Sequence, residues 1–104
     1  MKPEIKRELV KALRSGKYQQ GRGVLCDHTG AMCCLGVLMD VAIDTYWEHL
    51  DIFTCWSIEG AVVMPTRKQL EAVGLSPIDA NTLSEMNDEG KTFAEIADWI
   101  EVNL

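Results

Sequence analysis

Cysteine and histidine, two residue types that bind zinc, stand close together in the first third of the chain. Cys26, His28, Cys33 and Cys34 would supply four ligands of the kinds found in tetrahedral zinc sites. The spacing argues against such a site, because structural zinc sites take ligand pairs from C-x2-4-C loops, whereas Cys33 and Cys34 are adjacent. We expect buried, reduced cysteines, an exposed turn histidine and no bound metal, since free cysteine is among the most buried residue types.

The same thiols could act as nucleophiles if a histidine activated one of them. Nothing in the sequence around His28 or His49 would orient either ring for that role. The chain also contains no G-x-S-x-G, G-x-x-x-x-G-K-[ST], H-E-x-x-H or C-x-x-C motif. We expect a protein that is not an enzyme and uses no cofactor, with a zinc- or thiol-dependent enzyme as the last-ranked alternative.

A short loop after residue 16 offers groups that bind anions. Its glycines would let successive amides turn toward one anion, Arg22 could form paired hydrogen bonds with a phosphate or carboxylate, and Tyr18 could stack on a base. The loop lacks the third glycine of a dinucleotide fingerprint. The candidate binding residues for an anionic small molecule, such as a nucleotide, are Lys17, Tyr18, Gln20 and Arg22. The alternative is a tight turn in which Arg22 pairs with acidic residues elsewhere.

Among the tryptophans, Trp99 is the candidate for contact with a partner. It lies beside an apolar stripe at helical spacing, formed by Phe93, Ile96, Ala97 and Ile100. A half-exposed tryptophan is a common anchor in protein interfaces, although a large residue at the edge of a core would show the same spacing. We expect Trp99 to be partly exposed and to bind a partner.

Charge is distributed unevenly along the chain. The net charge is −6 at pH 7, yet residues 1–25 hold seven Lys or Arg against two Glu, and the remaining residues hold three against 14 acidic residues. This pattern predicts a basic surface on an otherwise acidic body. The acidic residues are dispersed, which solubility explains as well as mimicry of DNA would, and nucleic acid is not an expected partner.

Length and composition favour one compact domain over residues 1–104. Hydrophobic residues make up 47% of the chain and charged residues 25%, both typical of globular proteins. No apolar run approaches the roughly 20 residues that cross a bilayer, and the first residues do not form a secretory signal. We expect a cytoplasmic protein without membrane contact, and a homo-oligomer is compatible with these features.

The expected elements begin with an amphipathic helix and a hairpin. Pro3 suits the first turn of a helix, and Gly16 is a typical stop after it. Arg7 and Lys11 fall on the solvent face of this helix, each three residues after a glutamate with which it can pair. Two short apolar runs that flank a turn sequence predict a hairpin over residues 24–33.

A buried helix and short strands are predicted for the middle of the chain. Leu35 begins an apolar stripe that continues at helical spacing to Tyr46, which predicts a core helix. Gly36 within it costs about 1 kcal/mol relative to Ala, so we expect another backbone segment to pack closely there. The aromatic and β-branched segment 47–64 predicts one or two short strands, notably at 60–64.

Three further helices are predicted from their N-terminal caps. Thr66, Ser76 and Thr92 are each followed three residues later by a side chain that can return a hydrogen bond, as in a capping box. Together these elements predict a single α+β domain, mainly helical, with about five helices, a small β-hairpin and short strands.

Three blocks of the sequence resemble a group of small, uncharacterised proteins of tailed bacteriophages and prophages. The blocks are Ala12-Leu13-Arg14-Ser15-Gly16-Lys17-Tyr18-x-Gln20-Gly21, Cys33-Cys34-Leu35-Gly36-Val37-Leu38 and Leu83-x-x-Met86-Asn87-Asp88-x-Gly90-Lys91-Thr92-Phe93-x-x-Ile96-Ala97. The resemblance covers the first third and the last quarter of the chain and leaves out residues 44–76. It implies an accessory protein made inside the host cell and supplies no catalytic residues.

Phage proteins of this size often bind a host component, including defence machinery, so the resemblance implies a host protein as the partner. We therefore expect a small intracellular accessory protein that acts non-catalytically on a host component, with counter-defence as one such role. The first alternative is a binding module or sponge for an anionic small molecule.

Overall fold

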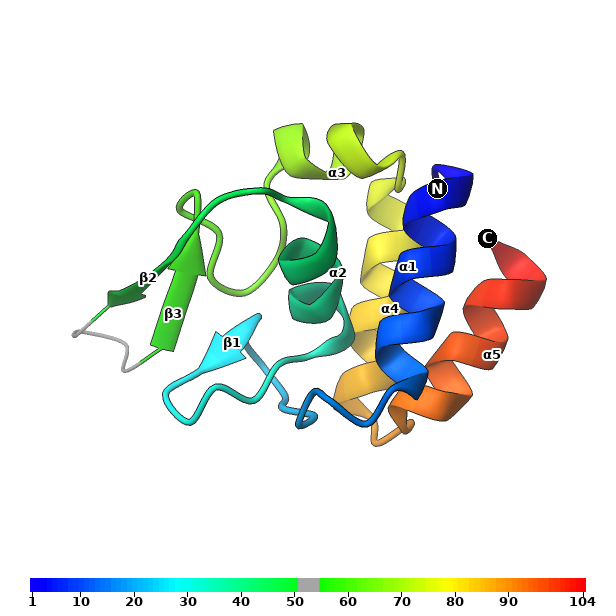
Figure 1. Ribbon diagram of the computed structural model, residues 1–104, viewed down its shortest axis with the longest axis horizontal. Helices are drawn as coiled ribbons and strands as arrows, with labels where there is room; N and C mark the ends of the chain where they lie inside the picture. The colour runs from blue at the N-terminus through cyan, green and yellow to red at the C-terminus, as the bar shows by residue number, and fades with distance from the viewer. Residues whose placement is uncertain (51–54) are drawn as a thin grey trace.

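The computed structural model describes residues 1–50 and 55–104, which form five helices and one three-stranded sheet (Figure 1). The elements follow in the order α1 (Pro3–Arg14), β1 (Cys26–Asp27), α2 (Cys34–Ala42), β2 (Trp47–Leu50), β3 (Cys55–Ile58), α3 (Arg67–Val73), α4 (Pro77–Asp88) and α5 (Phe93–Asn103). The predicted α+β class with mainly helical content is confirmed.

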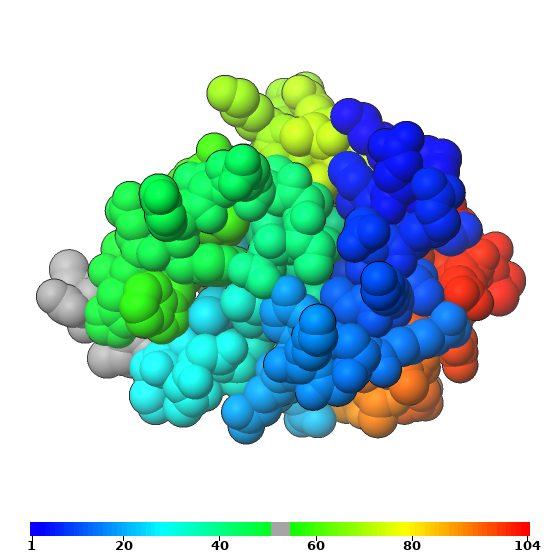
Figure 2. Space-filling view, viewed as in Figure 1, coloured from blue at the N-terminus to red at the C-terminus, as the bar shows by residue number. Residues whose placement is uncertain are grey.

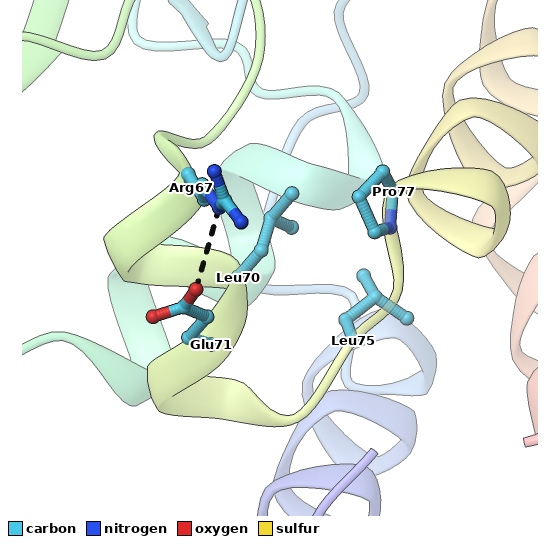
Figure 3. Close-up of a pocket in the computed structure, with 5 residues that line it drawn as sticks. All are labelled: Arg67, Leu70, Glu71, Leu75 and Pro77. Atoms are coloured by element: carbon cyan, nitrogen blue, oxygen red, sulfur yellow. Dashed lines mark ion pairs between the residues drawn. The ribbon is translucent and has the colours of Figure 1, made fainter.

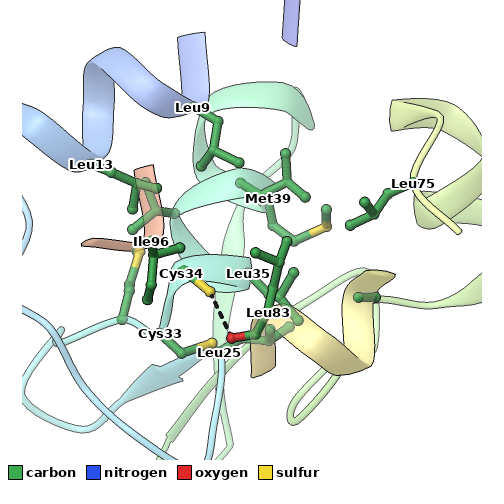
Figure 4. Packing of buried hydrophobic residues seen from close by; sticks show 14 of the residues in the cluster. Leu9, Leu13, Leu25, Cys33, Cys34, Leu35, Met39, Leu75, Leu83 and Ile96 are labelled. Atoms are coloured by element: carbon green, nitrogen blue, oxygen red, sulfur yellow. Dashed lines mark hydrogen bonds between the residues drawn. The ribbon is translucent and has the colours of Figure 1, made fainter. Parts of the chain in front are cut away.

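The helices form a body, and the sheet extends from one side of it as an arm (Figure 1). α1 packs against both α2 and α5, and α2 also contacts α4. α2 lies at the centre, where Leu35 and Met39 are enclosed and Leu9 and Leu13 of α1 close over them (Figure 4). Within residues 1–50 and 55–104, no helix has the length and apolar character needed to cross a membrane.

The first helix and the three capped helices form as predicted. Pro3 begins α1, and Gly16 follows its end with a φ of +76°. Thr66 and Thr92 make complete capping boxes, and the Ser76 side chain accepts a hydrogen bond from the backbone N–H of Asp79. These ends were predictable because a cap depends on residues within one helical turn.

The core helix is shorter than its apolar stripe predicts. α2 ends at Ala42, because Ile43 adopts an extended backbone and begins a run of poor helix formers. Tyr46, expected on the buried face, is therefore beyond the helix and 88% exposed. The expected close approach at Gly36 is confirmed, since a Cβ there would overlap the carbonyl oxygen of Leu25.

The sheet is antiparallel with the order β1-β3-β2, and β2 and β3 are the short strands expected within residues 47–64. The prediction of a strand at 60–64 is wrong. Glu59 and Gly60 have φ values of +51° and +85° and form a turn, after which Ala61 pairs back with Ile58. The chain thus reverses where a continuous strand was expected, and β3 precedes the turn.

The hairpin expected over 24–33 forms only around its turn. The backbone N–H of Asp27 donates to the Ala31 carbonyl at 2.8 Å, and a single bridge joins Cys26 to Met32. The longer pairing of β1 is with β3, where Cys26 lies opposite Trp56. The turn is therefore the edge of the three-stranded sheet and not an independent hairpin.

Candidate functional site

The structure divides the predicted anion-binding residues between two places. Lys17 and Tyr18 line a shallow groove of about 200 Å³ between the end of α1 and α2, together with Lys11 and Glu8. Gln20 and Arg22 lie instead beside the turn between α4 and α5. The loop thus contributes to two surfaces. The groove between α1 and α2 is the one lined by two lysines and the Tyr18 ring.

Hydrogen bonds inside the protein occupy the side chain of Gln20. Its Nε2 donates to Asn87 Oδ1 at 2.9 Å and to the Lys91 carbonyl at 2.7 Å. Arg22 is exposed and lies against Gly90, where an added Cβ would come within 3.3 Å of its guanidinium. Arg22 forms no ion pair with any described residue. Gln20 positions the loop, whereas Arg22 remains accessible to an anion.

Asn87 explains why the loop takes this course. It is fully buried; its Oδ1 accepts from Gln20 Nε2 and from the backbone N–H of Cys34 at 3.1 Å, and its Nδ2 donates to the Gly21 carbonyl at 2.8 Å. Residues from all three of the sequence blocks quoted above therefore meet at one side chain. All of its polar atoms are bonded, so Asn87 holds the fold together.

Cys26, Cys33 and Cys34 lie in environments that disfavour the thiolate. All four cysteines are buried. Burial raises the pKa of Cys26 to about 11 and also raises the pKa values of Cys33 and Cys34. The Cys34 thiol donates to the Leu83 carbonyl at 3.4 Å (Figure 4). A cysteine nucleophile needs the opposite environment, one that lowers its pKa.

His28 is exposed in the turn, as expected, while the cysteines around it are buried. Among residues 1–50 and 55–104, no three His, Cys, Asp or Glu side chains are grouped closely enough to hold a metal ion. The zinc ligands considered from the sequence are therefore not brought together.

A groove that the residue pattern does not predict lies over the sheet. We call it the aromatic groove; it has a volume of about 350 Å³ and is lined by Cys26, His28, Thr29, Gly30, Met32, Trp47 and Trp56. The strand register places Trp47 opposite Ile58, and Trp56 opposite both His49 and Cys26. Directly opposed residues share a face of the sheet, and so do residues two apart along one strand. Trp47 therefore shares a face with Ile58, and Trp56, two residues before Ile58, lies on that face too.

Polar and ring contacts fix the aromatic side chains around this groove. The Trp47 indole N–H donates to Asp40 Oδ1 at 3.0 Å, and the Tyr18 hydroxyl donates to Asp40 Oδ2 at 2.6 Å. Burial and this second hydrogen bond raise the pKa of Tyr18 to about 12. Trp56 packs edge-on against His49, with 5.0 Å between ring centroids and 74° between planes. Both tryptophans are thus held in place by neighbouring side chains.

The segment that contains the strands of the sheet arm and α2 has a net negative charge. Residues 23–66 contain no Lys or Arg and six acidic residues. α1 contains more basic than acidic residues. In Figure 2, α1 lies at the right of the molecule and the sheet arm at the left. The basic residues of α1 are thus separated from the acidic residues of the sheet arm.

The basic face of α1 is only partly neutralised. Arg14 forms ion pairs with Asp98 at 2.6 Å and Glu101 at 2.7 Å across to α5. The expected pairs of Arg7 and Lys11 with glutamates in their own helix do not form, and neither cation has an ion-pair partner among the residues described. Both line a groove of about 280 Å³ between α1 and α5.

A depression of about 550 Å³ lies between α3 and the start of α4 (Figure 3). Leu70, Leu75 and Pro77 form its apolar walls, and Arg67 pairs with Glu71 at 3.5 Å on its rim. Both charged side chains are more than two-thirds exposed, so their ion pair is of the weak surface kind. This depression offers less distinctive chemistry than the aromatic groove.

Trp99 lies on α5, is partly exposed as expected, and packs against the edge of the core. It is not among the residues that line the aromatic groove. Its role in partner binding remains a prediction.

Comparison with known families gives one match. Residues 1–69 match a family model described as Domain of unknown function (DUF8296). The matched region contains α1, α2, the described strands and every residue that lines the aromatic groove, and it ends within α3. No curated protein and no solved structure matches the chain.

Proposed function

The chain belongs to the DUF8296 family of domains of unknown function, and we propose that it acts non-catalytically by binding another protein through the aromatic groove. The observation that carries this proposal is the pair of tryptophans, Trp47 and Trp56, that other side chains hold beside an open groove. Tryptophan is enriched among the residues that dominate interface energies. Side chains ordered before binding lose less entropy when the complex forms.

The proposed partner is a component of the cell in which the protein is made. This part of the proposal rests on the resemblance to accessory proteins of tailed phages, which act on their hosts from inside the cell. A host protein, with defence machinery as one candidate, is the corresponding target, and counter-defence is the corresponding role. The aromatic groove supports binding of a protein in general, and the resemblance to phage proteins supports the choice of a host-cell protein as the partner.

Affinity capture with matched tryptophan variants tests this proposal. The bait is the full chain, compared with Trp56→Leu in the groove and Trp99→Leu on α5, with folding of each variant checked by circular dichroism. We expect a partner, identified by mass spectrometry and confirmed by direct titration, that the wild type and Trp99→Leu retain and Trp56→Leu loses. If Trp99→Leu alone loses it, the interface lies on α5 and the groove proposal fails.

The second candidate function is binding of an anionic small molecule. The observation that favours it is the groove that Lys11, Lys17 and Tyr18 line together. A bound nucleotide should raise the melting temperature by mass action. Lys17→Ala should remove that rise, whereas Arg22→Ala should leave it intact if the ligand occupies this groove and not the α4–α5 turn. No rise with any nucleotide would argue against this function.

A further inference from the structure

We propose that the aromatic groove recognises a cationic side chain, arginine or lysine, in a basic segment of the partner protein. This inference rests on the proposed function, because it specifies the chemistry of the partner that the groove accepts. Two independent features of the sheet arm lead to it: the aromatic lining of the groove and the sign of the charge around it.

The lining supplies aromatic rings that attract cations. Trp47 and Trp56 lie on the same face of the sheet and border one space, together with the aliphatic part of Met32. A cation within about 6 Å of an indole face is attracted by the ring quadrupole, and tryptophan is the strongest of the aromatic residues in this respect. The hydrocarbon stems of arginine and lysine also pack on apolar surface while the charged end stays accessible to water.

The neighbouring carboxylates strengthen this attraction. Asp40 accepts the indole N–H of Trp47, which places a negative charge at the edge of that ring. Asp27 begins the turn that lines the groove, and hydrogen bonds from Thr29 lower its pKa, so it is ionised at neutral pH. A carboxylate beside a low-dielectric surface favours a cation more than one in open water does.

In the sequence around the groove, histidine is the only basic residue type that could compete for these carboxylates. No Lys or Arg occurs in residues 23–66; of the two histidines there, His28 lines the groove and His49 packs on Trp56. The carboxylates of this arm would repel an acidic peptide, and a neutral apolar side chain would gain no charge attraction from Asp40 or Asp27. Charge complementarity therefore selects a basic partner segment.

Nuclear magnetic resonance of the tryptophan indole N–H groups tests this inference, because each tryptophan gives one signal that a variant can assign. The probes are three short peptides that differ at one central residue: arginine, its neutral isostere citrulline, or glutamate. We expect the arginine peptide to shift the signals of Trp47 and Trp56 and to leave Trp99 unchanged. The citrulline peptide should bind about tenfold more weakly, and raising NaCl from about 50 to about 500 mM should weaken the arginine peptide.

Two charge-removing variants make the test specific. Asp40→Asn keeps an oxygen that can accept the Trp47 indole N–H and removes the charge, so it should weaken the arginine peptide about threefold or more. Glu85→Gln removes the same charge from the exposed face of α4 and should leave binding unchanged. Equal binding of arginine and citrulline peptides, preference for the glutamate peptide, or absence of shifts at millimolar peptide would each overturn the inference.

These outcomes are separable from a failure of the proposed function. If capture of a partner depends on Trp56 while the peptides show no preference for a positive charge, the groove binds a protein by another chemistry and only this inference fails. If capture is independent of Trp56, the proposed function fails even where the arginine peptide binds.

Discussion

At Gly36, α2 packs so closely against the segment before it that no side chain fits. A Cβ there would overlap the Leu25 carbonyl oxygen and lie 2.8 Å from the carbonyl carbon. Both neighbours are backbone atoms that cannot rotate away, so we expect Gly36→Ala to lower the free energy of unfolding by more than about 3 kcal/mol. Urea denaturation at pH 7 measures this loss.

Gly16→Ala is the matched control. Gly16 has a φ of +76° but no atom within 4 Å of an added Cβ, so the substitution strains only the backbone. Its expected cost is about 1–2 kcal/mol. Equal losses at the two positions would show that α2 can shift away from Leu25 and that the contact at Gly36 is not restrictive.

Asn87 is the second residue on which the fold depends. Replacing it with Ala leaves the Cys34 N–H and the Gly21 carbonyl without their partner, and Gln20 Nε2 keeps only its hydrogen bond to the Lys91 carbonyl. We expect Asn87→Ala to cost about 3 kcal/mol in urea denaturation, because buried unsatisfied groups retain their desolvation penalty. Asn81→Ala, an exposed position on the same helix, should change stability by less than about 0.5 kcal/mol. Similar small effects for both variants would contradict the bridging role of Asn87.

Among the elements, the turn at 27–30 should make stability depend on pH. Hydrogen bonds from Thr29 and Ala31 lower the pKa of Asp27 below its unfolded value, which is about 3.9. These hydrogen bonds to ionised Asp27 therefore stabilise the fold fully at pH values above the unfolded pKa. Their contribution is lost as the pH falls through the pKa that Asp27 has in the folded protein. Asp27→Asn should lower stability at pH 7, and the difference from wild type should shrink below about pH 4.

Urea denaturation at several pH values from neutral to strongly acidic measures this difference. Asp44→Asn is the control for loss of a negative charge, because its carboxylate accepts no hydrogen bond within residues 1–50 and 55–104. A stability difference between wild type and Asp27→Asn that stays constant down to low pH would rule out ionisation of Asp27 as its cause.

Short-range sequence patterns predicted the helices. They could not place the strands, which depend on pairing between segments that are distant in the sequence. The caps at Thr66 and Thr92 depend on the next three residues, so their positions were readable in the sequence. The strands depend on partners elsewhere, because residues 47–50 form a strand by pairing with β3, with Trp47 opposite Ile58. Apolar composition alone favoured 60–64, where a turn forms instead.

The candidate site shows the same limit. The loop that carries Lys17 and Arg22 was recognisable from its residue types, but its course depends on Asn87, which is distant in the sequence. Trp47 and Trp56 were visible as residues and not as a site, because only the strand register brings them to one face. The signal available in the sequence was the presence of both tryptophans in the segment 47–64, whose aromatic and β-branched residues predict strands.

On the scale of the whole molecule, the family match and the folded unit have different boundaries. The match ends at residue 69, yet α1 packs on α5, and α2 packs on α4. Leu83, Ile96 and Ile100, which lie after the match, are fully buried. The part that carries the aromatic groove therefore depends on the last two helices for its core.

A fragment of residues 1–69 should consequently fail to fold alone. It would expose the buried faces of α1 and α2 and leave the partners of Asn87 unbonded, and burial of apolar area is the main favourable contribution to folding. We expect no cooperative thermal transition in circular dichroism and poor dispersion in proton spectra. Adding a peptide of residues 70–104 should restore both, whereas removing residues 102–104, where Val102 is 85% exposed, should leave the full chain cooperative. A cooperative 1–69 fragment would show that the matched region has a sufficient core of its own and that α4 and α5 are additions to it.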